Sequence, residues 1–75
     1  MIKIYSTPTC PYCKMTKNFL DELGLPYEDI DVSADQAAAE EMIQKSGQMA
    51  TPVLDINGKI ILGFDKDKIA EALRG

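Results

Sequence analysis

Cys10 and Cys13 are the residues of this sequence whose types and spacing could do chemistry. They are its only cysteines, two residues separate them, and the sequence contains no histidine. Without histidine, a Cys–His nucleophilic pair and the common zinc hydrolase sites each lack an essential partner. Two cysteines at this spacing can close a small disulfide with little movement of the backbone. The pattern therefore predicts thiol–disulfide exchange.

The position of Cys10 favours a reactive thiolate. The thiolate is the nucleophilic form of cysteine, and the unpaired N–H groups at the start of a helix lower the pKa of a nearby thiol. Pro11 suits the first turn of a helix, which places Cys10 immediately before that helix. We expect the Cys13 N–H and S–H to reach back toward Cys10, with Lys14 and Lys17 adding positive potential nearby. Cys10 is thus the predicted nucleophile, and Cys13 is predicted to resolve the mixed disulfide.

Two further segments are predicted to meet the substrate. A cis Thr51–Pro52 bond would place Thr51 backbone groups near Cys10, where they could pair with an incoming thiol peptide, although cis bonds make up only about 5–6% of X–Pro bonds. Gly63 permits close approach of another backbone, and Asp65 could meet an amino group of a ligand or simply begin a helix. The predicted substrate-binding residues are Pro11, Tyr12, Thr51, Pro52, Gly63, Phe64 and Asp65.

Other readings of the cysteine pair remain open. One is a static disulfide or two buried thiols, which a reducing cytosol and a strand-to-helix turn both disfavour. Another is a non-enzymatic iron–sulfur or metal carrier in which two copies pair through Cys10, because one C-x-x-C supplies only half of a four-ligand site. The rigid ring of Pro11 would crowd a cluster. We therefore predict no metal site and no permanently bound cofactor.

The elements that must position the cysteines follow from the spacing of apolar residues and turn signals. The predicted strands are residues 1–6, 27–32, 53–56 and 59–63, and the predicted helices begin near Pro11, Ser33 and Asp65, the first ending at Gly24 and the second at Ser46-Gly47. Asn57-Gly58 is a strong hairpin signal, and the first two strands should be parallel across their helix. The order β-α-β-α-β-β-α predicts an α/β fold with a mixed four-stranded sheet and three helices. The apolar residues expected in its core are Met15, Phe19, Ile43, Val53, Ile69 and Leu73.

Size and charge limit the function classes. Residues 1–75, at 8.3 kDa, predict one small domain acting as a monomer. Eight basic against twelve acidic residues give a net charge of −4, which argues against nucleic acid as a partner. No apolar run is long enough to span a bilayer, and Met1-Ile2-Lys3 leads into structured-looking sequence without a signal segment. We expect a cytoplasmic protein.

These motifs together resemble the glutaredoxin family. Cys10-Pro11-Tyr12-Cys13 is the active-site tetrapeptide of dithiol glutaredoxins, letter for letter. The resemblance extends through Ile4-Tyr5-Ser6, Glu41-Met42-Ile43, Ser46-Gly47, Thr51-Pro52-Val53, Asn57-Gly58 and Gly63. It implies a thioredoxin-like fold with a cis-proline loop facing the active site. It also implies reduction of protein disulfides or glutathione mixed disulfides, with Cys10 as nucleophile and glutathione as co-substrate.

Three departures bear on the electron donor. Thr7 stands where many glutaredoxins have a lysine that meets the glutathione carboxylate, and Ala50-Thr51-Pro52 replaces Thr-Val-Pro. Gly63-Phe64 replaces Gly-Gly, and Asp65-Lys66 follows it. With a Gly-Phe pair at this position, the sequence resembles short glutaredoxin-like proteins and redoxins linked to ribonucleotide reductase. Those proteins can take electrons from thioredoxin reductase. The alternative is therefore a thioredoxin-reductase-dependent redoxin that donates electrons to ribonucleotide reductase.

Overall fold

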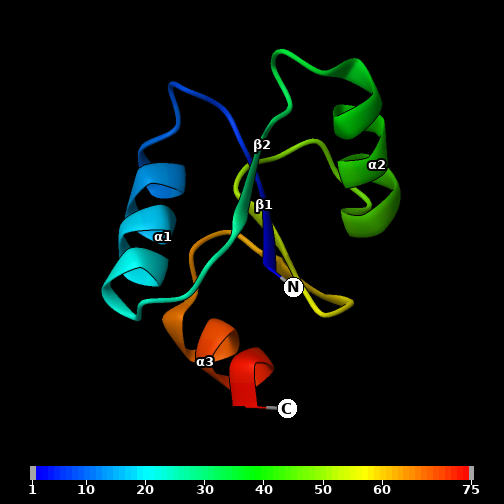
Figure 1. Cartoon of the computed structure of the whole chain (residues 1–75). Coiled ribbons are helices and arrows are strands. Elements are labelled where there is room, and N and C mark those ends of the chain that lie inside the picture. Colours follow the sequence, from blue (N-terminus) through cyan, green and yellow to red (C-terminus); the bar gives the residue numbers. More distant parts are fainter. Residues whose placement is uncertain (1, 75) are drawn as a thin grey trace.

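The computed structural model describes residues 2–74 as one four-stranded sheet with helices on both faces (Figure 1). Its elements are β1 (Ile2–Ser6), α1 (Pro11–Glu22), β2 (Glu28–Asp31), α2 (Gln36–Ser46), β3 (Val53–Ile56), β4 (Lys59–Leu62) and α3 (Lys66–Arg74). The predicted element order and fold class are confirmed. Met1, which the prediction includes in the first strand, lies outside the described residues.

The strand order β2-β1-β3-β4 places β1 in the middle of the sheet. β1 pairs in parallel with β2 and antiparallel with β3, and β3 and β4 form an antiparallel hairpin. Asn57 and Gly58 make the hairpin turn with φ of 52° and 92°, as a tight hairpin turn of this kind requires. The central position of β1 matters for function because the loop from its last residue, Ser6, leads directly to Cys10.

Two apolar layers hold the helices to the sheet. α1 and α3 cover one face and α2 covers the other (Figure 1). Side chains alternate along β1, so Ile4 faces the first layer and Tyr5 faces the second. The buried residues of the first layer are Ile2, Ile4, Leu20, Leu54, Ile56, Ile61, Ile69 and Ala72. Those of the second are Tyr5, Met42 and Val53.

Two residues expected in the core are exposed, so those predictions are wrong. Met15 is 46% exposed and Ile43 is 36% exposed. Each residue of a helix is rotated by about 100° from the one before it. The buried face of α1 runs through Cys13, Thr16 and Leu20, which turns Met15 toward the opposite side. Among the other expected core residues, the buried ones are Val53 and Ile69, and the partly buried ones are Phe19 and Leu73.

The start of α2 also differs from the prediction. Asp35, not Ser33, is the N-cap: its carboxylate accepts the N–H of Ala38 at 3.2 Å. Ser33 lies two residues before Asp35, and its N–H donates to the side chain of Asp31 at 2.9 Å. Aspartate and serine are both good N-cap residues, and here the carboxylate nearer the helix takes the role. The predicted end at Gly47 is confirmed, with φ of 77°.

Candidate active site

Cys10 is the N-cap of α1, directly after the loop that leaves β1. Its backbone is extended (φ −96°, ψ 110°), and the helix begins at Pro11 as predicted. The Cys13 N–H donates to the Cys10 sulfur at 3.2 Å, and the Lys14 N–H donates to the Cys10 carbonyl at 3.3 Å. Cys10 is partly exposed, whereas Cys13 is fully buried. One sulfur is therefore open to a substrate and the other is covered.

The surroundings move the pKa values of the two thiols in opposite directions. Partial burial raises the pKa of Cys10, but hydrogen bonds from the side chains of Cys13 and Thr51 and from the N–H groups of Cys13 and Tyr12 outweigh it, so the net pKa is lowered. Burial raises the pKa of Cys13, and its hydrogen bond to Cys10 raises it further. The arrangement keeps the proton on Cys13 and favours the thiolate at Cys10.

The residues around Cys10 come from three parts of the chain. Tyr12 is 60% exposed on the first turn of α1. The Thr51–Pro52 peptide bond is cis, and hydrogen bonding by the Thr51 side chain lowers the pKa of each thiol. The Gly63 N–H donates to the Pro52 carbonyl at 2.9 Å and so joins the end of β4 to the cis-proline loop. The structure thus brings Tyr12, Thr51, Pro52 and Gly63 to the cysteine end of the sheet.

Phe64 and Asp65 make contacts of another kind. The Phe64 ring meets that of Phe19 edge-on, with centroids 6.0 Å apart, and the Lys66 ammonium lies 5.7 and 5.8 Å from the two centroids. The carboxylate of Asp65 accepts the Lys68 N–H at 3.1 Å, which fits its predicted place at the start of the last helix. The ring contacts of Phe64 and Lys66 with Phe19 hold the start of α3 against α1. A direct contact of Phe64 or Asp65 with a ligand stays a prediction.

A groove of about 300 Å³ starts beside the active-site loops and runs toward α2. Thr7 and Thr51 line its end nearest Cys10, and Met42 and Met49 line it farther along. Its complete lining is Thr7, Val32, Ser33, Met42, Met49, Ala50 and Thr51, all with uncharged side chains. Met49 is not among the predicted site residues, although its place just before the proline loop was an available signal.

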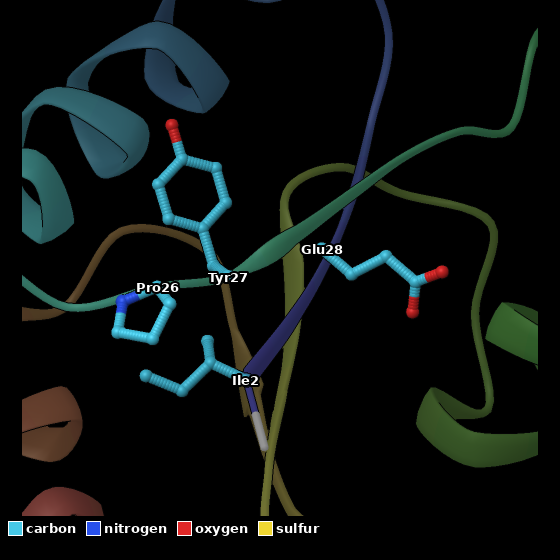
Figure 2. A pocket seen from close by; sticks show the side chains of 4 residues that line it. All are labelled: Ile2, Pro26, Tyr27 and Glu28. Carbon is cyan, nitrogen blue, oxygen red and sulfur yellow. The ribbon is translucent and has the colours of Figure 1, made fainter.

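A larger hollow of about 470 Å³ lies elsewhere (Figure 2). Ile2, Pro26, Tyr27 and Glu28 line it. Ile2 begins β1, whereas Cys10 follows the end of that strand, so the hollow is at the opposite end of the sheet from the cysteines. Its volume alone therefore does not identify it as the reaction site.

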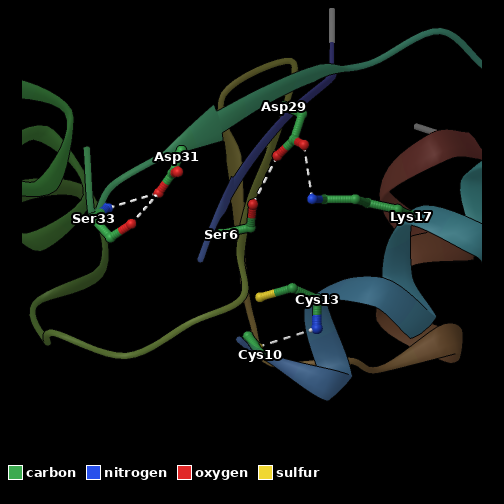
Figure 3. A network of polar contacts seen from close by, with 7 residues as sticks. All are labelled: Ser6, Cys10, Cys13, Lys17, Asp29, Asp31 and Ser33. Carbon is green, nitrogen blue, oxygen red and sulfur yellow. Dashed lines mark hydrogen bonds and ion pairs between the residues drawn. The ribbon is translucent and has the colours of Figure 1, made fainter. Parts of the chain in front are cut away.

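Behind Cys13, a chain of polar contacts links α1 to the parallel strands β1 and β2. The Ser6 hydroxyl donates to one oxygen of the Asp29 carboxylate at 2.7 Å, and the Lys17 ammonium lies 2.7 Å from the other oxygen (Figure 3). Ser6 and Asp29 are not among the predicted site residues. Lys17 was predicted to lie near Cys10, but its spacing of four residues from Cys13 was the better signal, because residues four apart share a helix face. We call Ser6, Lys17 and Asp29 the Lys17 network.

Two general features of residues 2–74 complete the description. Within this range, no group of three or more His, Cys, Asp or Glu side chains is placed to hold a metal ion. Among the same residues, no helix has the length and apolar character needed to cross a membrane.

Comparison with known proteins identifies the family. The family model described as glutaredoxin matches residues 2–61. The glutaredoxin-like 8.6 kDa protein in the rubredoxin operon of Clostridium pasteurianum is 49% identical over 69 residues, which are 92% of each chain. The crystal structure of a glutaredoxin from Archaeoglobus fulgidus is 30% identical with a TM-score of 0.91, covering 99% of this chain and 86% of that one.

A second solved structure is similar over nearly its whole length. NrdH-redoxin from Escherichia coli, a glutaredoxin-like protein with a thioredoxin-like activity profile, is 30% identical with a TM-score of 0.84 and is covered to 91%, against 93% of this chain. Family match, sequence identity and fold agree with each other and with the C-x-x-C at the start of α1. This chain belongs to the glutaredoxin family, whose members are thiol–disulfide oxidoreductases with a thioredoxin-like fold.

Proposed function

We propose that this protein reduces protein disulfides, glutathione mixed disulfides or both through a dithiol–disulfide cycle of Cys10 and Cys13. The observation that carries the proposal is the asymmetry of the two thiols. Cys10 is accessible, sits at a helix N-terminus and has a lowered pKa, whereas Cys13 is buried and has a raised pKa. A dithiol cycle uses both kinds of sulfur, an exposed thiolate that attacks the substrate and a protonated thiol that resolves the mixed disulfide.

The cycle has two exchange steps that balance in atoms and electrons. In the first, the Cys10 thiolate attacks a substrate disulfide R–S–S–R′, forms the mixed disulfide Cys10–S–S–R′ and releases R–S⁻. In the second, Cys13 gives up its proton and attacks the Cys10 sulfur, which forms the Cys10–Cys13 disulfide and releases R′–S⁻. The released thiolates take up the protons that their own pKa values dictate. Two electrons pass from the protein to the substrate, and an external donor then restores the dithiol.

The substrate contacts follow from the surfaces around Cys10. Pro11 and Tyr12 flank the nucleophile, and we propose that the exposed Tyr12 ring packs on the substrate. The backbone of Thr51 would pair with the extended chain of the substrate cysteine, as in a short strand addition. Pro52 is held by its hydrogen bond from Gly63, which would keep this edge in place. Phe64 and Asp65 complete the proposed binding residues at the base of α3.

Glutathione is the first candidate for the electron donor. In this proposal it reduces the Cys10–Cys13 disulfide as a co-substrate, and no cofactor is permanently bound. The protein would act as a monomer in the cytoplasm on disulfide-containing partners.

A second donor is favoured by specific observations. The groove beside Cys10 is lined by uncharged side chains, and Thr7 occupies its active-site end where a lysine would attract a carboxylate. NrdH-redoxin, with its thioredoxin-like activity profile, is covered over 91% of its length. Thioredoxin reductase would then supply the electrons, and ribonucleotide reductase would be a disulfide partner.

Two coupled assays and two variants test the proposal. NADPH oxidation is followed with glutathione plus glutathione reductase and, separately, with thioredoxin reductase; the faster system identifies the donor. We expect Cys10→Ser to abolish both activities. Cys13→Ser, the matched control with the same chemical change, should lose protein-disulfide reduction but keep turnover of glutathione mixed disulfides. Equal loss from both variants in the glutathione assay would contradict a monothiol route, and inactivity of the parent protein with both donors would refute the function.

A further inference from the structure

We propose that Lys17, held in place by Asp29 and Ser6, is a positioning residue for the second exchange step, in which its ammonium group stabilises the thiolate that Cys13 must become. This inference rests on the proposed function and concerns its second exchange step, in which the buried Cys13 reacts. Cys13 is fully buried and its first-step role is to keep a proton. In the second step the same sulfur must lose that proton, so a positive charge on its covered side is useful.

The geometry places such a charge there. Cys13 and Lys17 are four residues apart on α1 and so lie on the same face, one turn from each other. Figure 3 shows the Cys13 side chain projecting from α1 toward the strands that carry Ser6 and Asp29. The Lys17 ammonium is fixed by its 2.7 Å contact with Asp29, which the 2.7 Å hydrogen bond from Ser6 holds from the other side.

Ser6 makes this anchor rigid. It is the last residue of β1, is 2% exposed, and sits on the strand that pairs in parallel with β2, where Asp29 resides. Both oxygens of the Asp29 carboxylate are thereby engaged, one by a neutral hydroxyl and one by the ammonium group. Because the contact with Asp29 already holds the Lys17 ammonium in place, little further side-chain entropy is lost when a negative charge forms at Cys13.

The charged groups around the pair come from several elements. Hydrogen bonding to Asp29 raises the pKa of Lys17 despite its partial burial, and electrostatic interaction with Cys13 adds to the increase, so the ammonium form persists. Tyr27, which precedes β2, also interacts with Lys17. Facing Cys13 are Cys10 across the turn, the hydroxyl of Thr51 and the backbone of Thr7. The groups that interact electrostatically with the Lys17 network are Cys13, Tyr27 and Asp31.

Ellman's reagent, an aromatic disulfide, separates the two steps in one measurement. The reduced protein releases one chromophoric thiolate when Cys10 attacks and a second when Cys13 resolves the mixed disulfide. Stopped-flow absorbance across pH therefore yields a rate–pH profile for each cysteine. Failure of the first release would refute the proposed function, whereas a change confined to the second release concerns only the role of Lys17.

Lys17→Met removes the charge and keeps most of the apolar stem. We take the loss of this charge to lower the thiolate fraction of Cys13 about tenfold near neutral pH. Each remaining thiolate is more basic and therefore about threefold more reactive, so we expect the second release to slow about threefold. Its profile should move to higher pH, while the first release changes less than twofold, by rough estimate. Lys17→Arg should restore the parent profile. Lys68→Met, which removes an equal charge from an exposed site on α3, is the matched control and should leave the second release unchanged.

Asp29→Asn distinguishes a charge effect from a structural one. The amide oxygen of asparagine can still accept from Lys17 while its amide N–H donates to the Ser6 hydroxyl, but a negative charge is removed from the Lys17 network, so the profile of the second release should move to lower pH. A purely structural ion pair would make Lys17→Met and Asp29→Asn act in the same direction. Profiles that shift together, or a Lys17→Met profile equal to that of the parent, would overturn the proposal. Thermal unfolding of each variant identifies any that fail to fold, and the Lys17→Arg and Asp29→Asn pair then carries the test.

Discussion

Replacing Thr51 with valine tests how the Cys10 thiolate is stabilised. Valine keeps the shape and β-branching of threonine but removes the hydroxyl that hydrogen-bonds to Cys10. The N–H of Cys13, at 3.2 Å from the sulfur, and the helix N-terminus remain. The variant therefore removes one donor from several. We expect the pKa of Cys10 to rise but to stay below that of an unperturbed thiol.

The magnitude follows from the exposure of the sulfur. Hydrogen bonds to charged groups contribute about 1.5–3 kcal/mol when buried, and partial exposure of Cys10 reduces this to about 1 kcal/mol. That free energy lowers the thiolate fraction about fivefold at pH values where Cys10 is mostly protonated. Each remaining thiolate is roughly twofold more reactive because it is more basic. The net rate of alkylation should fall about two- to threefold at acidic pH and rise about twofold at alkaline pH.

Iodoacetamide alkylation measured from pH 4 to pH 10, with the modified peptide identified by mass spectrometry, provides the assay. The buried Cys13 reacts slowly and does not obscure the signal. The decisive feature is that the Thr51→Val and parent curves cross. Curves that coincide would show that the hydroxyl contributes nothing, and a parallel decrease at every pH would indicate lost access or altered structure in place of an electrostatic effect.

Two predictions concern stability. Asp35→Ala removes the N-cap that accepts the Ala38 N–H, so the free energy of unfolding in urea should fall by about 1 kcal/mol, whereas Ser33→Ala should cost less than half as much. Equal losses of stability in the two variants would contradict the assignment of Asp35 as the N-cap of α2. Asp55→Asn weakens the 2.7 Å contact with Lys45 and should lower stability at pH 7 by about 1–2 kcal/mol. Because the hydrogen bond from Lys45 lowers the pKa of folded Asp55, the stabilisation is complete above the unfolded pKa of about 3.9 and is lost as pH falls through the lower folded pKa. Parent and variant should therefore converge in acid, and a gap that stays constant down to about pH 2 would contradict this assignment.

The order of elements could be predicted because each has a local signal. Asn57-Gly58 requires a tight turn, and Pro11 and Gly47 mark a helix start and a helix end that depend on backbone geometry alone. The same reasoning located Cys10 as an N-cap. Here the chemistry and the local structure depend on the same few residues, so little information from the rest of the fold was needed.

Burial of particular side chains could not be predicted as well, because it depends on which face of a helix meets the sheet. The apolar spacing of Met15 and Phe19 suggested one stripe on α1, but the buried stripe includes the polar Thr16. Its hydroxyl donates to the Tyr12 carbonyl at 2.8 Å, which removes the cost of burying it. The pattern of apolar residues alone therefore predicted a buried face of α1 that is rotated away from the observed one.

The Lys17 network could not be predicted from the sequence, because it depends on the register between β1 and β2. Ser6 is adjacent to Asp29 only because β1 and β2 run parallel, with Ser6 opposite Asp31 and Ile4 opposite Asp29. A shift of one residue would turn Asp29 to the other face of the sheet and leave Lys17 without its partner. The nucleophile is thus specified by a local turn, whereas the surroundings of the resolving thiol are specified by the pairing of distant segments. For this reason we expect substitutions that disturb β1–β2 pairing to slow the second exchange step before they affect the first, a difference that the two-phase release from Ellman's reagent measures directly.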